Sequence, residues 1–165
     1  MRFSRFAQFA ATLFLFAIAL TAPGHAQGNK QIISGTYYED RASHVSSGNS
    51  MITLTLTQTP TNKFVNITNV SCIVATFASQ AFPYGQLQLG TAPGQNDIGR
   101  TYTLRGISPI PNAGGYNFYS VGVDGMFFKI GPGRFPSIAL YSTVPSSGGL
   151  YLWGDCTVTG TLSDS

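Results

Sequence analysis

Apolar and polar residues alternate along most of the chain after residue 27, which is the period of a half-buried β-strand. Met51–Thr57 is the clearest case, because Ile52, Leu54 and Leu56 share one face and threonines take the other. Threonine is β-branched and polar, so it suits the solvent face of a strand. The same alternation predicts further strands at Ile32–Tyr38, Gln86–Leu89, Thr101–Ile107, Tyr116–Val123, Met126–Ile130, Ile138–Val144, Leu150–Trp153 and Cys156–Leu162.

Clusters of Gly, Pro, Asn and Ser separate these segments and predict turns, because proline cannot donate to a strand ladder. We expect the adjacent acids Glu39 and Asp40 in a solvated turn after Tyr38, and His44 in a polar loop. The main clusters are Ser46–Ser50, Ala92–Asn96, Pro109–Gly115, Gly131–Pro136 and Pro145–Gly149.

One segment changes phase. Val65 and Ile67 are apolar at odd positions, whereas Val70, Cys72 and Val74 are apolar at even positions. A strand buries both sets on one face only if it carries an extra residue, so we expect a bulge or a turn near Thr68–Asn69. The competing interpretation is a strand that is buried on both faces.

The two cysteines fall in phase with apolar neighbours. Cys72 shares a face with Val70 and Val74, and Cys156 shares one with Val158, so both sulfurs should point inward. We predict one core disulfide, between two facing sheets or between neighbouring strands of one sheet. Two buried free thiols are the alternative.

Nine to ten short strands, no helical periodicity and one core disulfide predict an all-β fold, a single antiparallel β-sandwich that spans residues 27–165. Jelly-roll and immunoglobulin-like topologies both fit this pattern. An up-and-down barrel ranks third.

Residues 1–26 have the layout of a secretory signal peptide of a bacterial kind, cleaved after Ala26. Arg2 and Arg5 precede the apolar stretch Phe9–Leu20, which is shorter than the ~20 residues that a membrane span needs. We therefore expect an exported protein, periplasmic or extracellular, with no membrane span in the mature chain.

Removing this segment leaves seven basic and six acidic residues, so the formal net charge falls from +3 to +1. No cluster of basic residues remains, and a nucleic-acid partner is not expected because it needs a concentrated basic face. Charged residues make up 9% of the whole chain, against ~25% in an ordinary domain, and Thr, Ser, Asn, Gln and Gly supply the polarity instead.

Candidate catalytic groups are sparse, and we expect no enzymatic activity. A glycosidase needs two carboxylates that face each other, whereas Glu39 and Asp40 are neighbours that a strand would point to opposite faces. The chain has no Gly-x-Ser-x-Gly motif, the nucleophile elbow that would present a serine to a base such as His44. One mature histidine also leaves too few soft ligands for zinc. No catalytic residue, metal ligand or cofactor is assigned.

Aromatic residues are the best positive feature, because their flat apolar faces stack on sugars and suit contact surfaces generally. Alternation places Phe118 and Phe128 in the core if Tyr119 and Phe127 are exposed. The candidate ligand-binding residues are Tyr116, Tyr119, Tyr151 and Trp153, with Arg134 in the loop Gly131–Pro136, whose glycines could turn N–H groups toward an anion.

These features favour a binding or interaction module for a carbohydrate or a surface protein. The first alternative is a structural subunit of a surface assembly, since small size and Thr- and Gly-rich composition resemble the chaperone-assembled pilins. Their disulfide closes a shorter loop than the 84 positions from Cys72 to Cys156, so no residue is assigned from them. The second alternative is a small secreted hydrolase whose acids converge only in the fold.

Overall fold

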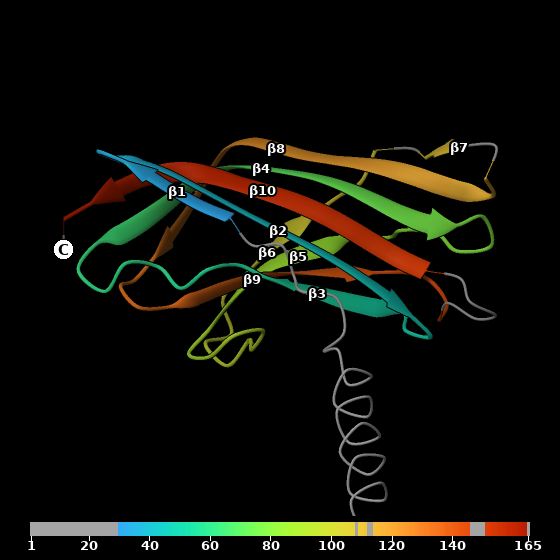
Figure 1. Ribbon diagram of the computed structural model, residues 1–165, viewed down its shortest axis with the longest axis horizontal. Helices are drawn as coiled ribbons and strands as arrows, with labels where there is room; N and C mark the ends of the chain where they lie inside the picture. The colour runs from blue at the N-terminus through green and yellow to red at the C-terminus, as the bar shows by residue number, and fades with distance from the viewer. Residues whose placement is uncertain (1–29, 108, 112–113, 146–150, 165) are drawn as a thin grey trace, which may run out of the picture.

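The protein is a β-sandwich of two antiparallel sheets, seen in a computed structural model that describes residues 30–107, 109–111, 114–145 and 151–164 (Figure 1). The six-stranded sheet has the order β1-β2-β10-β4-β8-β7, and the four-stranded sheet has the order β3-β9-β5-β6. This confirms the predicted all-β sandwich. The strands are β1 Lys30–Ser34, β2 Tyr37–Ser47, β3 Met51–Thr55, β4 Phe64–Phe77, β5 Gly85–Gly90, β6 Thr101–Leu104, β7 Ile110–Pro111, β8 Tyr116–Ile130, β9 Phe135–Tyr141 and β10 Tyr151–Ser163.

The core lies between the two sheets and is mainly aliphatic, with four aromatic side chains, Tyr38, Phe82, Tyr119 and Phe128. Ile52 and Leu54 of β3, Ile138 of β9, and Val70 and Val158 of the facing sheet are all at most 2% exposed. Burying such a side chain is worth roughly 1.5–3 kcal/mol, so these positions supply the main driving force for folding.

The disulfide joins Cys72 and Cys156, as predicted, and it links neighbouring strands of one sheet. The two residues lie directly opposite each other on β4 and β10, with Cα atoms 4.1 Å apart. Both are buried in the core cluster. Of the two geometries left open by the sequence, the within-sheet bridge is the one observed.

The expected irregularity near Thr68–Asn69 is a β-bulge. Thr159 pairs with Asn69 and the next residue, Gly160, pairs with Ile67, so Thr68 is an extra residue in β4. The bulge turns Ile67 and Val70 to the same core face, which accounts for the phase change.

The predicted segments Tyr116–Val123 and Met126–Ile130 form one strand, β8, with an irregularity of its own. Ile67 pairs with Phe128 and Asn69 pairs with Asp124, so β8 holds additional residues beside the bulge, including Gly125 at φ +67°. The core-facing residues of β8 therefore have odd numbers before Gly125 and even numbers after it.

As a result, the expected burial of two aromatics is reversed. Tyr119 is 6% exposed and lies in the core, whereas Phe118 points to the outer face. Phe128 is buried and Phe127 is 71% exposed, as alternation predicted.

The N-terminal part differs from the prediction in another way. The segment Ile32–Tyr38 is a hairpin of β1 and β2 that turns at Gly35, whose φ of +59° favours glycine. The predicted turn at Glu39–Asp40 and the predicted loop at His44 are both wrong, since these residues lie within β2 and Asp40 is fully buried. Hydrogen bonds from Thr57, described below, stabilise the buried carboxylate, and no local pattern shows them.

The last strand is also longer than predicted, because residues 151–153 and Cys156–Leu162 belong to the single strand β10, whereas residue 150 of the predicted segment Leu150–Trp153 lies outside the described residues. The expected strand Thr101–Ile107 is shortened to β6, and the expected strand Ile138–Val144 begins and ends three residues earlier, as β9. The predicted signal peptide, residues 1–26, lies outside the described residues. Within those residues, no helix is long and apolar enough to cross a membrane.

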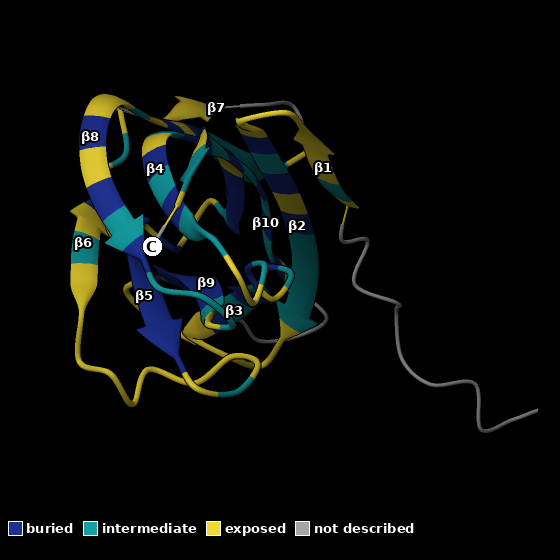
Figure 2. Ribbon diagram, turned by 90° about the vertical axis from the view of Figure 1, so that its left-hand side faces the viewer, coloured by how far each residue is buried: buried dark blue, intermediate teal, exposed yellow. Residues whose placement is uncertain are grey.

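The outer face of the four-stranded sheet is covered. Ala139 and Ser137 alternate with the core residues Ile138 and Leu140, yet both are 0% exposed. The loop 91–99 lies against this face, where a Cβ on Gly94 would sit 3.4 Å from Thr55 Oγ1. Figure 2 shows the consequence, since β5 is buried almost throughout whereas β8 alternates between buried and exposed residues.

Candidate functional site

The outer face of the six-stranded sheet carries a row of apolar side chains at right angles to the strands. Register places Val45 of β2 opposite Trp153 of β10, Trp153 opposite Ala75 of β4, and Ala75 opposite Phe118 of β8. Phe118 in turn lies opposite Ile110 of β7. Antiparallel pairing, which sets residues directly opposite one another, produces this straight row.

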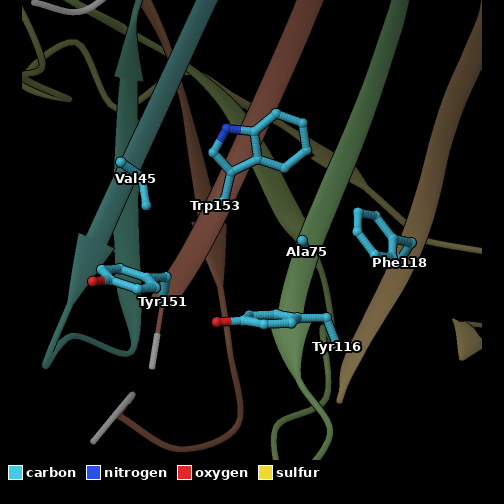
Figure 3. Close-up of a pocket in the computed structure, with 6 residues that line it drawn as sticks. All are labelled: Val45, Ala75, Tyr116, Phe118, Tyr151 and Trp153. Atoms are coloured by element: carbon cyan, nitrogen blue, oxygen red, sulfur yellow. The ribbon is translucent and has the colours of Figure 1, made fainter. Parts of the chain in front are cut away.

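A trough of about 300 Å³ lies over the middle of the row, lined by Val45, Ala75, Tyr116, Phe118, Tyr151 and Trp153 (Figure 3). Ala75 forms the floor, because its methyl group stands between the large rings of Trp153 and Phe118 in neighbouring strands. A small residue flanked by two aromatic rings leaves a hollow on a sheet that would otherwise be filled.

Two tyrosines close one end of the trough. Figure 3 shows Tyr116 and Tyr151 side by side, with the Tyr116 hydroxyl directed toward Tyr151. Tyr116 packs edge-on against Phe77, with ring centroids 5.7 Å apart and planes at 88°, which fixes its ring. The lining of the trough is therefore apolar, and the phenolic hydroxyls of the two tyrosines, which can donate and accept hydrogen bonds, lie beside it.

Three of the four predicted aromatic residues meet here, namely Tyr116, Tyr151 and Trp153. Tyr151 is 48% exposed and the other two are half-buried, so ring surface remains open to solvent. Tyr119 is not part of the site, because it faces the core and packs on Phe82.

Arg134 also lies elsewhere, in the loop before β9 of the other sheet. Its backbone N–H donates to Thr59 Oγ1, and the N–H of Gly133 donates to the carbonyl of Pro60. These backbone donors are used inside the protein, so the loop does not present them to an anion.

Sequence reasoning missed three lining residues: Val45, Ala75 and Phe118. Val45 follows His44, where the sequence predicts a loop, and unbroken alternation predicts Phe118 in the core. Ala75 follows Val74 in an apolar run, where nothing along the chain marks it as a contact residue. It becomes the floor of the trough only because it pairs with Trp153 on one side and with Phe118 on the other.

Six acidic side chains belong to residues 30–164, and each has a different partner. Tyr37 donates to Glu39, Asn69 to Asp124 and Thr91 to Asp97. Arg41 binds Asp155 with two N–H groups, and Lys63 pairs with Asp164. Each of the six carboxylates is therefore engaged by a donor of its own within the described part of the chain.

Asp40 is the one fully buried carboxylate among the described residues. Burial raises its pKa above the ordinary 3.8, although hydrogen bonds from the backbone N–H of Thr57 at 2.6 Å and from its hydroxyl at 3.2 Å oppose the shift. The neighbouring Tyr38 is buried as well, and burial followed by the charge of Asp40 raises the pKa of its phenol. Asp40 thus ties β2 to the segment after β3, the Tyr38 hydroxyl donates to Asp40, and neither residue lines the trough.

Comparison with known proteins adds no relative. A scan against protein-family models, a search of curated proteins and a search of solved structures each found no match.

Proposed function

We propose that this chain is an exported, non-enzymatic binding module, and that its ligand lies in the aromatic trough of the six-stranded sheet. The observation that carries the proposal is the meeting of Tyr116, Tyr151 and Trp153 around one open hollow. Tyrosine and tryptophan offer a flat apolar face and a polar edge, which suits a ligand that is apolar on one side only. A carbohydrate has this chemistry, because sugar rings present C–H faces and carry hydroxyls at their rims.

The disulfide supports the exported location. A bridge between Cys72 and Cys156 persists in an oxidising compartment, such as the periplasm or the medium. This agrees with the signal peptide expected at residues 1–26.

The alternative, a structural subunit of an assembly, requires a sheet edge that can pair with another molecule. The edge strands β1, β3 and β6 are short, with five, five and four residues, and short edges blunt such pairing. The fourth edge strand, β7, has two residues and pairs with only two of the 15 residues of β8, so the assembly alternative rests on the rest of that β8 edge. The separate partners of the six acids give no support to a hydrolase.

The test uses the single tryptophan of the chain, Trp153, as its own reporter. The mature protein is screened on a glycan array, and compounds that bind are titrated by tryptophan fluorescence and by calorimetry. We expect Trp153→Ala to abolish calorimetric binding, because it removes a wall of the trough.

The matched control is Phe127→Ala, which removes a 71% exposed aromatic ring from the other end of β8. It should bind like the wild type. Binding that survives Trp153→Ala, or an array with no binder at all, contradicts the proposal.

A further inference from the structure

The apolar row is longer than the trough at its centre. From Val45 to Ile110 it crosses five strands, and at ~4.8 Å between strands its length is roughly 19 Å. Ile110 at the far end is 70% exposed, so the row stays open beyond Phe118. A ligand that uses all of it must be elongated and must lie across the strands.

Two flanking rows define the width. Phe77 pairs with Tyr116 on one side, in the row that Tyr151 and Ser47 continue. Ile73, which is 52% exposed, pairs with Ser120 on the other side, in the row of Asp155 and Ser43. Phe77 lies four positions after Ile73 in β4, so the apolar strip is roughly 14 Å wide and covers roughly 270 Å².

This area is too small for a second copy of the chain or a folded partner. A stable protein–protein interface buries ~800 Å² on each side, about three times what the strip offers. A single extended chain is the kind of ligand that fits.

An extended peptide is disfavoured by its backbone. The strip lies on the face of the sheet, over β10 and β4, where the backbone groups already bond to neighbouring strands. A peptide laid there would find no ladder partners for its own N–H and C=O groups over an apolar floor, which is costly. A sugar ring lays its C–H face on the floor and keeps its hydroxyls at the rim.

The rim is polar but carries no free charge among its described residues. Ser43, Ser47 and Ser120 flank the strip, together with the hydroxyls of the two tyrosines. Asp155 is the one charged side chain in the three rows, and Arg41 binds both of its carboxylate oxygens. An anionic or cationic ligand would meet no opposite charge.

Building on the proposed function, we infer that the ligand is an uncharged linear glycan, bound across the strands so that successive sugar rings contact Trp153, Phe118 and Ile110. Affinity then depends on chain length, because short chains occupy the trough and longer ones reach Ile110.

The experiment is a calorimetric titration with cello-, malto- and chito-oligosaccharides of two to six sugars, and with oligogalacturonides as the charged probe. We expect at least one uncharged series to bind about tenfold more tightly at six sugars than at two. Ile110→Ser should remove most of that gain and leave binding of the disaccharide unchanged.

The matched control is Ile107→Ser, which changes an isoleucine 65% exposed and three positions earlier, outside the row. It should have no effect on either length. The inference is overturned if affinity does not rise with length, if oligogalacturonides bind as tightly, or if both isoleucine variants behave alike.

Two further outcomes separate the inference from the proposed function. Binding that requires Trp153 but shows no length dependence, or that is confined to other compounds on the array, overturns the inference and leaves the binding module standing. The absence of any binding that requires Trp153 overturns both.

Discussion

The two outer faces of the sandwich start from the same pattern and end differently. Each sheet has an alanine that points away from the core on a central strand, Ala75 on β4 and Ala139 on β9. Ala139 lies on the face against which loop 91–99 packs, whereas Ala75 is the floor of an open trough. A face that the protein covers itself serves stability, and a face left open with aromatic walls is available to a ligand.

The difference comes from what lies over the sheet. Asp97 accepts hydrogen bonds from the N–H and hydroxyl of Thr91, which hold the covering loop closed and lower the pKa of the carboxyl. The described residues place no corresponding loop over Trp153, whose ring borders the hollow.

The largest effect should come from removing the disulfide beneath the open face. Replacing both Cys72 and Cys156 by alanine should lower the free energy of unfolding by about 2–5 kcal/mol, because the bridge restricts the unfolded chain over 84 positions. Denaturant unfolding measures this loss. In this variant, amide hydrogen exchange should increase more in β4 and β10 than in β5 and β9. An equal increase in both sheets would contradict the view that the disulfide stabilises the six-stranded sheet in particular.

A phenylalanine at each alanine compares the faces directly. Ala139→Phe should cost about 1–3 kcal/mol, because a ring under the covered face forces the packing apart. Ala75→Phe should stay within ~0.5 kcal/mol, because the trough has room for the ring, and it should block ligand binding. Thermal and urea unfolding of the two variants test the pair; equal costs would show that the faces do not differ as described.

The smallest effect concerns Asp40, which ties β2 of one sheet to Thr57 beyond β3 of the other. Its folded-state pKa is raised above 3.8, so the folded state holds the proton more tightly than the unfolded chain. Stability from this group is therefore full below pH 3.8 and is lost as the pH rises through the raised pKa. Relative to Asp40→Asn, the wild type should lose stability over this window and then level off.

Urea unfolding at a series of pH values measures this profile. Asp164→Asn, which alters an exposed carboxylate and keeps Asp40, is the control and should follow the wild-type profile. If the wild type instead became more stable relative to Asp40→Asn as the pH rises, the pKa of Asp40 would be lowered in the folded state rather than raised, which would contradict the prediction.

The sequence alone predicts the features that depend on neighbours along the chain. The alternation of apolar and polar residues identifies the sandwich. The odd or even numbering of the apolar positions identifies the inward-facing cysteines and the bulge at Thr68. Tyr116, Tyr151 and Trp153 are identified as candidates because residue type alone marks them as contact residues.

Features that depend on distant partners are not predictable in this way. Asp40 looks like a turn residue until Thr57 is brought to it, and the odd positions of β8 turn inward only because Gly125 and its neighbours shift the strand. The trough itself arises from register across β10, β4 and β8, which no single strand encodes.

The place of β10 in the sheet sets the order of events during synthesis. This strand follows the other nine in the chain, yet it lies between β2 and β4 and carries Cys156 to its partner. While residues 151–163 are still missing, β2 and β4 have no strand between them and the disulfide cannot close. The six-stranded sheet can therefore close only after β10 has been made, and pairing over such long sequence separations is slow. Such a delay fits the export proposed above, in which the chain crosses a membrane before it folds.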